Sequence, residues 1–224
     1  MPGRNIPLIS GEFYHVFNRG ISDQLVFFSR RDYDRFFQSI LYYQHYDTPI
    51  SYSKFMKISR IQRTLIFEDL LKRNNLVSEI MSFCLMPNHF HLLLRQVKDN
   101  GIPSFISNLT NSYTKYFNTK SSRRGPMFQG KFKAVRIETD EQLLHVSRYI
   151  HLNPHTAYIV KSEDELMQYP YSSLIDYLGN RTNVPIQKDY ILSKFKNIQS
   201  FKQFTLDNKD YQRELGHIKH LIFE

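Results

Sequence analysis

The stretch SEIMSFCLMPNHFHLLLRQ, residues 78–96, predicts two strands that fold back on each other. Aliphatic and aromatic side chains fill both halves, and the central MPN contains the proline and asparagine that are common in tight turns. Side chains two residues apart on a strand share a face. His89 and His91 therefore lie on one face and Phe90 on the other, so the hairpin presents two imidazoles together. We expect the strands at 78–85 and 89–96 and the turn at 86–88.

The segments on either side of this hairpin indicate an α+β fold. Alternating side chains predict strands, and apolar residues at helical spacing predict helices. The expected order is strand 12–19, helix 31–45, a basic helical insertion at about 48–76, the hairpin, helix 103–119, strand 131–138 and helix 139–153. Thr139 or Asp140 is expected to begin the last helix and Pro154 to end it. A hairpin among strands that alternate with helices is typical of the split βαβ, ferredoxin-like antiparallel sheet.

A second region follows this sheet domain, which we place at residues 1–180. Residues 181–224 are expected to form a separate C-terminal helical extension. Two segments within it, 188–198 and 211–224, have apolar residues at amphipathic helical spacing.

The composition favours a polyanionic partner. The 224 residues include 30 Lys and Arg against 21 Asp and Glu, a net charge of +9 at pH 7. This charge favours nucleic acid, although many ordinary proteins are basic. No apolar run approaches the ~18 residues of a membrane span, and the N-terminus is too weakly apolar for a secretory signal. The single cysteine, Cys84, excludes a disulfide within the chain and fits a reducing cytosol.

His89 and His91 admit two interpretations. A strand histidine pair often only packs, but two imidazoles on one face also form part of a divalent-metal site, whose third ligand must come from another element. Tyr149 and Asn153 are four residues apart and share a face of the last helix. The Asn153 amide oxygen is a candidate third ligand, and Tyr149 a candidate nucleophile toward a phosphate on the cation. For Tyr149, one of 15 tyrosines, a packed aromatic is the alternative.

Five blocks of sequence carry more specific information. They are YHVFNRG (14–20), CLMPNHFHLLLR (84–95), GPMFQGKFKA (125–134), RYIHLNP (148–154) and YPYSS (169–173). In order and spacing, over roughly residues 10–178, they resemble the single-tyrosine HUH transposases. HUH denotes histidine, hydrophobic residue and histidine, which His89-Phe90-His91 matches. The blocks are most similar to the REP-associated tyrosine transposase branch and its transposase-like relatives in bacterial genomes.

The resemblance implies cleavage of hairpin-forming single-stranded DNA on a ferredoxin-like sheet. Carried over residue by residue, His89 and His91 match the paired metal ligands, Tyr149 the nucleophile and Asn153 the third polar ligand. The implied cofactor is Mg²⁺ or Mn²⁺, and the implied reaction is a transesterification through a 5′-phosphotyrosine intermediate. The resemblance also implies a bacterial protein of the cytoplasm, associated with the nucleoid, that acts as a monomer or homodimer.

Basic residues near these blocks are candidates for contacts with DNA phosphates, which position the substrate without reading its sequence. The candidates are Arg19, Arg123, Arg124, Lys131 and Lys133. The aromatic residues Tyr113, Tyr116 and Phe128 are candidates for stacking on unpaired bases. For each, a solvated charge or a core aromatic is the alternative.

Other functions remain open on the sequence alone. A domesticated protein would bind hairpin DNA without cutting it, although the intact His-x-His and Tyr149 argue against this. Another HUH nickase, of the replication-initiator or relaxase type, is a further alternative, but RYIHLNP with a single helix tyrosine favours the transposase branch. The sequence has no match to the aromatic sheet motifs of RNA-recognition domains.

Overall fold

The computed structural model describes residues 8–182 and 184–207. Within these residues, four strands form one antiparallel sheet in the order β2-β3-β1-β4. The strands are β1 Phe13–Arg19, β2 Ser78–Met86, β3 His89–Gln96 and β4 Lys133–Ile137. With a long helix and a helical insertion between β1 and β2 and one helix between β3 and β4, the chain follows the ferredoxin-like βαββαβ order. The α+β fold predicted from the sequence is confirmed.

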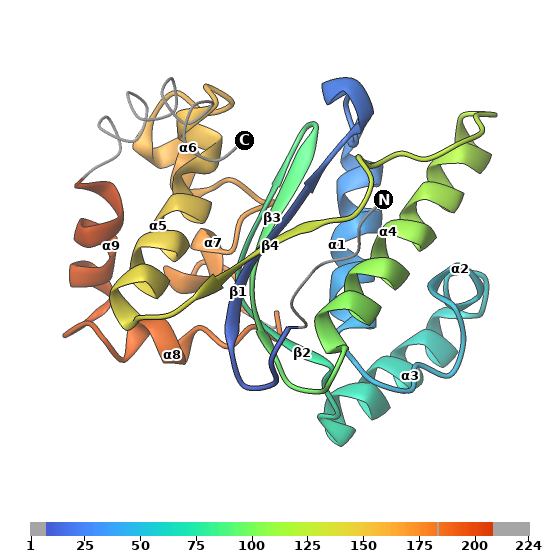
Figure 1. Ribbon diagram of the computed structural model, residues 1–224, viewed down its shortest axis with the longest axis horizontal. Coiled ribbons are helices and arrows are strands. Elements are labelled where there is room, and N and C mark those ends of the chain that lie inside the picture. Colours follow the sequence, from blue (N-terminus) through green and yellow to red (C-terminus); the bar gives the residue numbers. More distant parts are fainter. Residues whose placement is uncertain (1–7, 183, 208–224) are drawn as a thin grey trace.

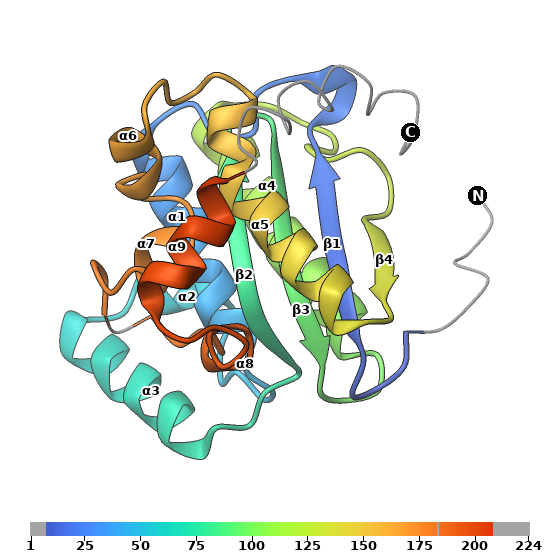
Figure 2. The same ribbon diagram turned by 90° about the vertical axis from the view of Figure 1, so that its left-hand side faces the viewer.

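Helices cover both faces of the sheet (Figures 1 and 2). One face packs against α1 Arg30–Tyr43 and α4 Gly101–Lys120, and the other against α5 Asp140–Thr156. The insertion between α1 and β2 contains α2 Tyr52–Phe55 and α3 Arg60–Arg73. A short 3₁₀ turn follows β1 at Ile21–Asp23, and the helices after α5 are α6 Glu163–Met167, α7 Leu174–Tyr177, α8 Asp189–Leu192 and α9 Ile198–Leu206. No helix in the described ranges has the length and apolar character needed to cross a membrane.

The sheet separates two apolar cores because its strands alternate as the sequence predicted. Phe90 on β3 packs with Val16 on β1 in the core beneath α1 and α4. Leu93 and Cys84 belong to the second core, beneath α5. β1 ends at Arg19, and at the next residue, Gly20, a Cβ would clash with the Gln24 carbonyl oxygen.

Helix α5 begins where the sequence indicated but continues past the predicted end. The Thr139 hydroxyl accepts a hydrogen bond from the Gln142 amide at 3.1 Å, which caps the helix. The prediction that Pro154 ends the helix is wrong, because α5 runs to Thr156. A proline this near a C-terminus removes only one hydrogen bond, and the Ala157 amide still donates to the Asn153 carbonyl at 3.0 Å. Asn153 therefore has helical geometry, in register with Tyr149.

The described part of the C-terminal region packs on α5. Ile191 of α8 and Phe201 of α9 are 1% and 2% exposed and lie in the second core. These residues therefore contribute to the sheet domain and are not separate from it. The boundary at residue 180 stays a prediction, and the predicted helix at 211–224 lies outside the described residues.

A buried carboxylate joins α1 to α4. The side chain of Asp32 is 0% exposed and accepts hydrogen bonds from Lys120 at 2.6 Å, Tyr116 at 2.9 Å and Ser29 at 2.9 Å. Burial alone would raise the pKa of Asp32, but these hydrogen bonds and the Lys120 charge outweigh it and hold the pKa below its usual value. Asp32 is therefore ionised at neutral pH and ties the first turn of α1 to the end of α4.

We predict that Asp32→Asn lowers the free energy of unfolding by about 2 kcal/mol at pH 7, because it removes charge-assisted hydrogen bonds. Since the folded state depresses this pKa, the stabilisation is complete above about pH 4 and is lost as the pH falls through the folded pKa. Urea unfolding at pH 7 and at acid pH measures both effects.

Asp34→Asn on the same helix is the control, because its ion pair with Arg30, at 3.8 Å, is exposed. It should change stability by less than about 0.5 kcal/mol. Equal effects of the two substitutions would contradict a special role for Asp32.

Candidate active site

The two predicted imidazoles lie on the central strand β3, on the face covered by α5. His89 pairs across the sheet with Arg19 and Met86. His91 pairs with Phe17 and Cys84, is 6% exposed, and its ring centroid is 4.9 Å from that of His89. The histidine pair is therefore fixed on both sides by neighbouring strands.

Helix α5 places Tyr149 directly against this pair. The Tyr149 ring meets the His91 ring edge-on, with centroids 5.5 Å apart. Tyr149 is half-buried, and most of its helix packs on the second core. The structure thus brings together the nucleophile and one of the ligands that the sequence proposed, from segments almost 60 residues apart in the chain.

Asn153 follows one turn later on α5. It is 6% exposed, and its Nδ2 donates to the Tyr149 carbonyl at 3.0 Å, so Oδ1 is the atom that can act as a ligand. In the described ranges no group of three or more His, Cys, Asp or Glu is arranged to hold a metal ion. Any cation here would need ligands beyond those residue types, and the Asn153 amide oxygen and substrate oxygens would supplement the two imidazoles. Imidazole nitrogens and an amide oxygen are both donors that divalent cations accept in proteins.

A third histidine belongs to the same cluster and was not assigned a role from the sequence. His15 on β1 lies with its Nε2 2.9 Å from Nδ1 of His91, and their rings stack with centroids 5.1 Å apart. Its ring also meets that of Tyr149 edge-on at 5.8 Å. Alternation put His15 on one face of its strand, but only the β1–β3 register shows that this is the face of His91.

Burial sets the charge state of the site. Burial, together with a smaller effect of the nearby Arg19 charge, lowers the pKa of His89 to about 4. His89 is therefore neutral at pH 7, as a metal ligand must be. Burial also raises the pKa of Tyr149, against smaller opposing effects of Asn153 and Arg19, so the hydroxyl carries its proton at neutral pH.

The predicted basic residues differ in where they point. Arg19 lies opposite His89 and is paired with Asp23 at 3.2 Å. Lys133 is exposed on β4, with Nζ 5.9 Å from the centroid of the Phe17 ring beside His91. Arg123 turns into its own loop and donates to the Pro126 carbonyl at 3.0 Å. Arg124 and Lys131 are exposed.

The predicted base-stacking aromatics are mostly core residues. Tyr113 is 0% exposed and Phe128 6% exposed, both packed beneath α1 and α4. The Tyr116 hydroxyl donates to buried Asp32. The prediction for Tyr113 and Phe128 is therefore wrong, because the local sequence around a helix or loop residue does not show how completely its side chain is covered.

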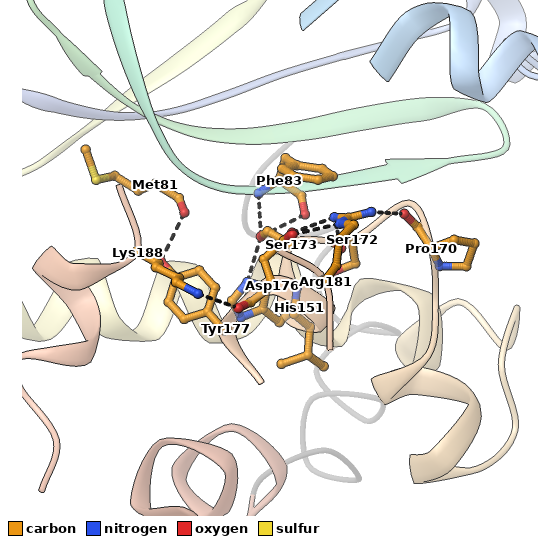
Figure 3. A network of polar contacts seen from close by, with 11 residues as sticks. Met81, Phe83, His151, Pro170, Ser172, Ser173, Asp176, Tyr177, Arg181 and Lys188 are labelled. Carbon is orange, nitrogen blue, oxygen red and sulfur yellow. Dashed lines mark hydrogen bonds and ion pairs between the residues drawn. The ribbon is translucent and has the colours of Figure 1, made fainter. Parts of the chain in front are cut away.

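The YPYSS block explains how α5 is held over the sheet (Figure 3). Ser173 accepts a hydrogen bond from the Phe83 amide of β2 at 2.9 Å, and the same hydroxyl lies 2.9 Å from Nε2 of His151 on α5. Ser173 and His151 are each 0% exposed. Since His151 lies two residues after Tyr149, this contact fixes the helix that carries the tyrosine.

An ion pair between Arg181 and Asp176 stabilises the segment that follows the YPYSS block. Arg181 donates to both carboxylate oxygens of Asp176, at 2.7 Å and 2.5 Å, and to the carbonyls of Pro170 and Ser172 at 2.7 Å and 3.1 Å. The Tyr177 hydroxyl donates to the Met81 carbonyl at 3.0 Å. The YPYSS block and the residues after it therefore cover the outer edge of β2. An isolated β-bridge between Cys84 and Ser172 joins the block to this edge.

We predict that Ser173→Ala lowers the free energy of unfolding by about 1–3 kcal/mol, because it leaves the Phe83 amide and the His151 ring without this buried partner. Ser193→Ala is the control, since its hydroxyl is exposed and donates only to the Tyr190 carbonyl of its own turn. Chemical denaturation of both variants measures the difference. Equal stabilities would show that the Ser173 hydroxyl does not hold the segment.

The site thus consists of two histidines on an inner strand of a ferredoxin-like sheet, beneath a tyrosine on the covering helix. Residues 51–153 match the family described as Transposase IS200 like, a segment that contains β2, β3 and α5 as far as Asn153. This match covers a little under half of the chain and agrees with the family predicted from its sequence.

The fold is also similar to that of a solved structure, a REP-associated tyrosine transposase bound to a REP hairpin. The TM-score is 0.51 at 16% sequence identity, over 80% of this chain and 86% of that one. No curated protein matches the chain.

Proposed function

We propose that the protein is a metal-dependent endonuclease and strand transferase that acts on hairpin-forming single-stranded DNA. The observation that carries the proposal is the contact between the rings of Tyr149 and His91, which supports Tyr149 as a nucleophile close to a candidate metal ligand. The match of residues 51–153 to the IS200-like transposase family supports the DNA-processing activity. The REP hairpin bound by the similar transposase supports a DNA hairpin as substrate.

The proposed reaction is a transesterification. The Tyr149 Oη attacks the scissile phosphorus, and the bond from phosphorus to the 3′ oxygen breaks. The tyrosine proton is lost during the attack and, directly or through solvent, the departing 3′ oxygen gains one. The products are a 5′-phosphotyrosine and a free 3′-hydroxyl. Because one phosphodiester replaces another, the 3′-hydroxyl of the same or another strand can reverse the step without a nucleotide triphosphate.

His89, His91 and the Asn153 amide oxygen would hold a Mg²⁺ or Mn²⁺ ion. When bound, this cation would polarise the scissile phosphate and so make it susceptible to a weak nucleophile. The protein contributes the rest of the site. β3 fixes the imidazoles, and α5 directs Tyr149 toward them. The burial that raises the pKa of Tyr149 makes activation of the phosphate necessary, because little phenolate exists at pH 7.

Tyr149 reaches the His91 of its own chain, which supports cleavage by a single subunit, whether the protein is a monomer or a homodimer. If the substrate is bacterial DNA, as the proposal holds, the protein acts in the cytoplasm at the nucleoid. The basic residues beside the site, Arg19 and Lys133, would contact phosphates of the bound strand.

We predict that a hairpin oligonucleotide incubated with the protein and Mn²⁺ forms a covalent adduct, which denaturing electrophoresis detects. Tyr149→Phe abolishes the adduct while binding persists, because only the attacking oxygen is lost. His91→Ala and a chelator each lower the yield by at least about 100-fold, the order of effect of an electrostatic catalytic group.

Tyr190→Phe is the matched control, since this tyrosine is 44% exposed and packs on Phe13 outside the cluster. It should form the adduct at the wild-type rate. Hairpin binding with no adduct in the wild-type protein, with either cation, would favour the domesticated binding protein.

We also predict that Lys133→Ala reduces the salt dependence of single-strand binding. Each lost phosphate contact should lower the slope of log affinity against log salt by about 0.7. Lys57→Ala is the control, since this exposed lysine belongs to the insertion on the opposite side of the sheet. Fluorescence anisotropy at several salt concentrations gives both slopes. A change at Lys57 and none at Lys133 would place the strand over the insertion.

A further inference from the structure

In both His89 and His91, the Nδ1 atom of the ring has a hydrogen-bond partner from a neighbouring side chain. We propose that His15 and Asn88 are positioning residues, which fix His91 and His89 in the tautomer that presents Nε2 to a divalent cation. The proposal rests on the proposed function for its purpose, but the tautomers are a property of the protein alone.

Asn88 determines the tautomer of His89. Its Oδ1 lies 2.6 Å from Nδ1 of His89, while its Nδ2 donates to the Asp23 carbonyl at 3.4 Å. A carboxamide oxygen only accepts hydrogen bonds, so the ring nitrogen that faces it must carry the proton. His89 therefore holds its proton on Nδ1, and Nε2 has the lone pair that a metal requires.

His15 has the corresponding position beside His91. Its Nε2 lies 2.9 Å from Nδ1 of His91, and a hydrogen bond between two neutral imidazoles needs one donor and one acceptor. If His91 donates, its Nε2 has a lone pair. If His15 donates, His91 carries its proton on Nε2 and that nitrogen cannot bind a cation. A metal site at His91 is compatible only with the first arrangement.

The contact also fixes the angle of the ring. His91 stacks on His15 with an interplanar angle of 22° and tilts against Phe17 at 5.7 Å, and Tyr149 meets both imidazoles edge-on. A rotation of His91 would therefore move the surface on which Tyr149 packs. Partners of metal-bound histidines typically change metal affinity by about 10–100-fold when they are removed.

The first test needs neither metal nor DNA. In the full-length protein labelled with ¹⁵N-histidine, two-bond proton–nitrogen spectra at pH 8 distinguish the two imidazole tautomers. We expect the Nδ1–H form at both His89 and His91. The Nε2–H form at His91 would overturn the proposal.

The second test compares two substitutions of His15 by Mn²⁺ binding, measured as loss of the free-ion electron paramagnetic resonance signal. His15→Phe removes the acceptor and should weaken Mn²⁺ binding by about 10–100-fold. His15→Gln keeps an acceptor oxygen and should stay within about threefold of wild type. Equal loss in both variants would overturn positioning, because it would show that the imidazole itself is required.

His45→Phe is the control for replacing a buried histidine. His45 is 5% exposed beyond the end of α1, and within the described residues neither of its ring nitrogens has a hydrogen-bond partner. It should bind Mn²⁺ as the wild type does. Wild-type protein with both Nδ1–H tautomers but no Mn²⁺ binding would uphold the hydrogen bonds and reject the proposed function.

Discussion

The pairing of β3 between β1 and β2 is the constraint on which the rest of the protein depends. Its register places His91 opposite Phe17 and Cys84, and it sends Phe90 to the opposite face. A shift of the β3 register by one residue would exchange the two faces of the strand. The imidazoles would then lie beneath α1 and α4, and the apolar side chains around Phe90 would face α5. The same pairing therefore specifies both cores and the position of the site between sheet and helix.

The second requirement is a fixed position for α5, which the residues that follow this helix in the chain provide. Residues after the helix return to the edge of β2, where Ser173 joins the Phe83 amide to His151. Ile191 and Phe201 then cover the outer side of the helix. These contacts hold α5 through residues other than Tyr149. The helix face that carries Tyr149 is therefore left for the proposed chemistry.

Much of the fold could be predicted because its signals are local. Alternation identified the strands, helical spacing identified α1, α4 and α5, and the distance of four residues placed Tyr149 and Asn153 together. Sequence analysis did not find the partner of His91, because a hydrogen bond between His15 and His91 depends on strand register over 76 residues of separation. It also misplaced the end of α5, since the cost of a proline depends on how many turns follow it. The burial of Tyr113 and Phe128 depends on the packing of two helices and a loop, which no single segment encodes.

Tyr149 contributes differently to the fold and to the proposed reaction, and this difference has an evolutionary consequence. Its ring packs at the margin of the second core, whereas the chemistry needs only its oxygen atom. A phenylalanine has the same ring, so loss of that one atom would leave the sheet, the histidines and the basic surface intact. In such a lineage, a mobile-element enzyme and a resident DNA-binding protein are neighbours in sequence space, separated by a single nucleotide change in the tyrosine codon.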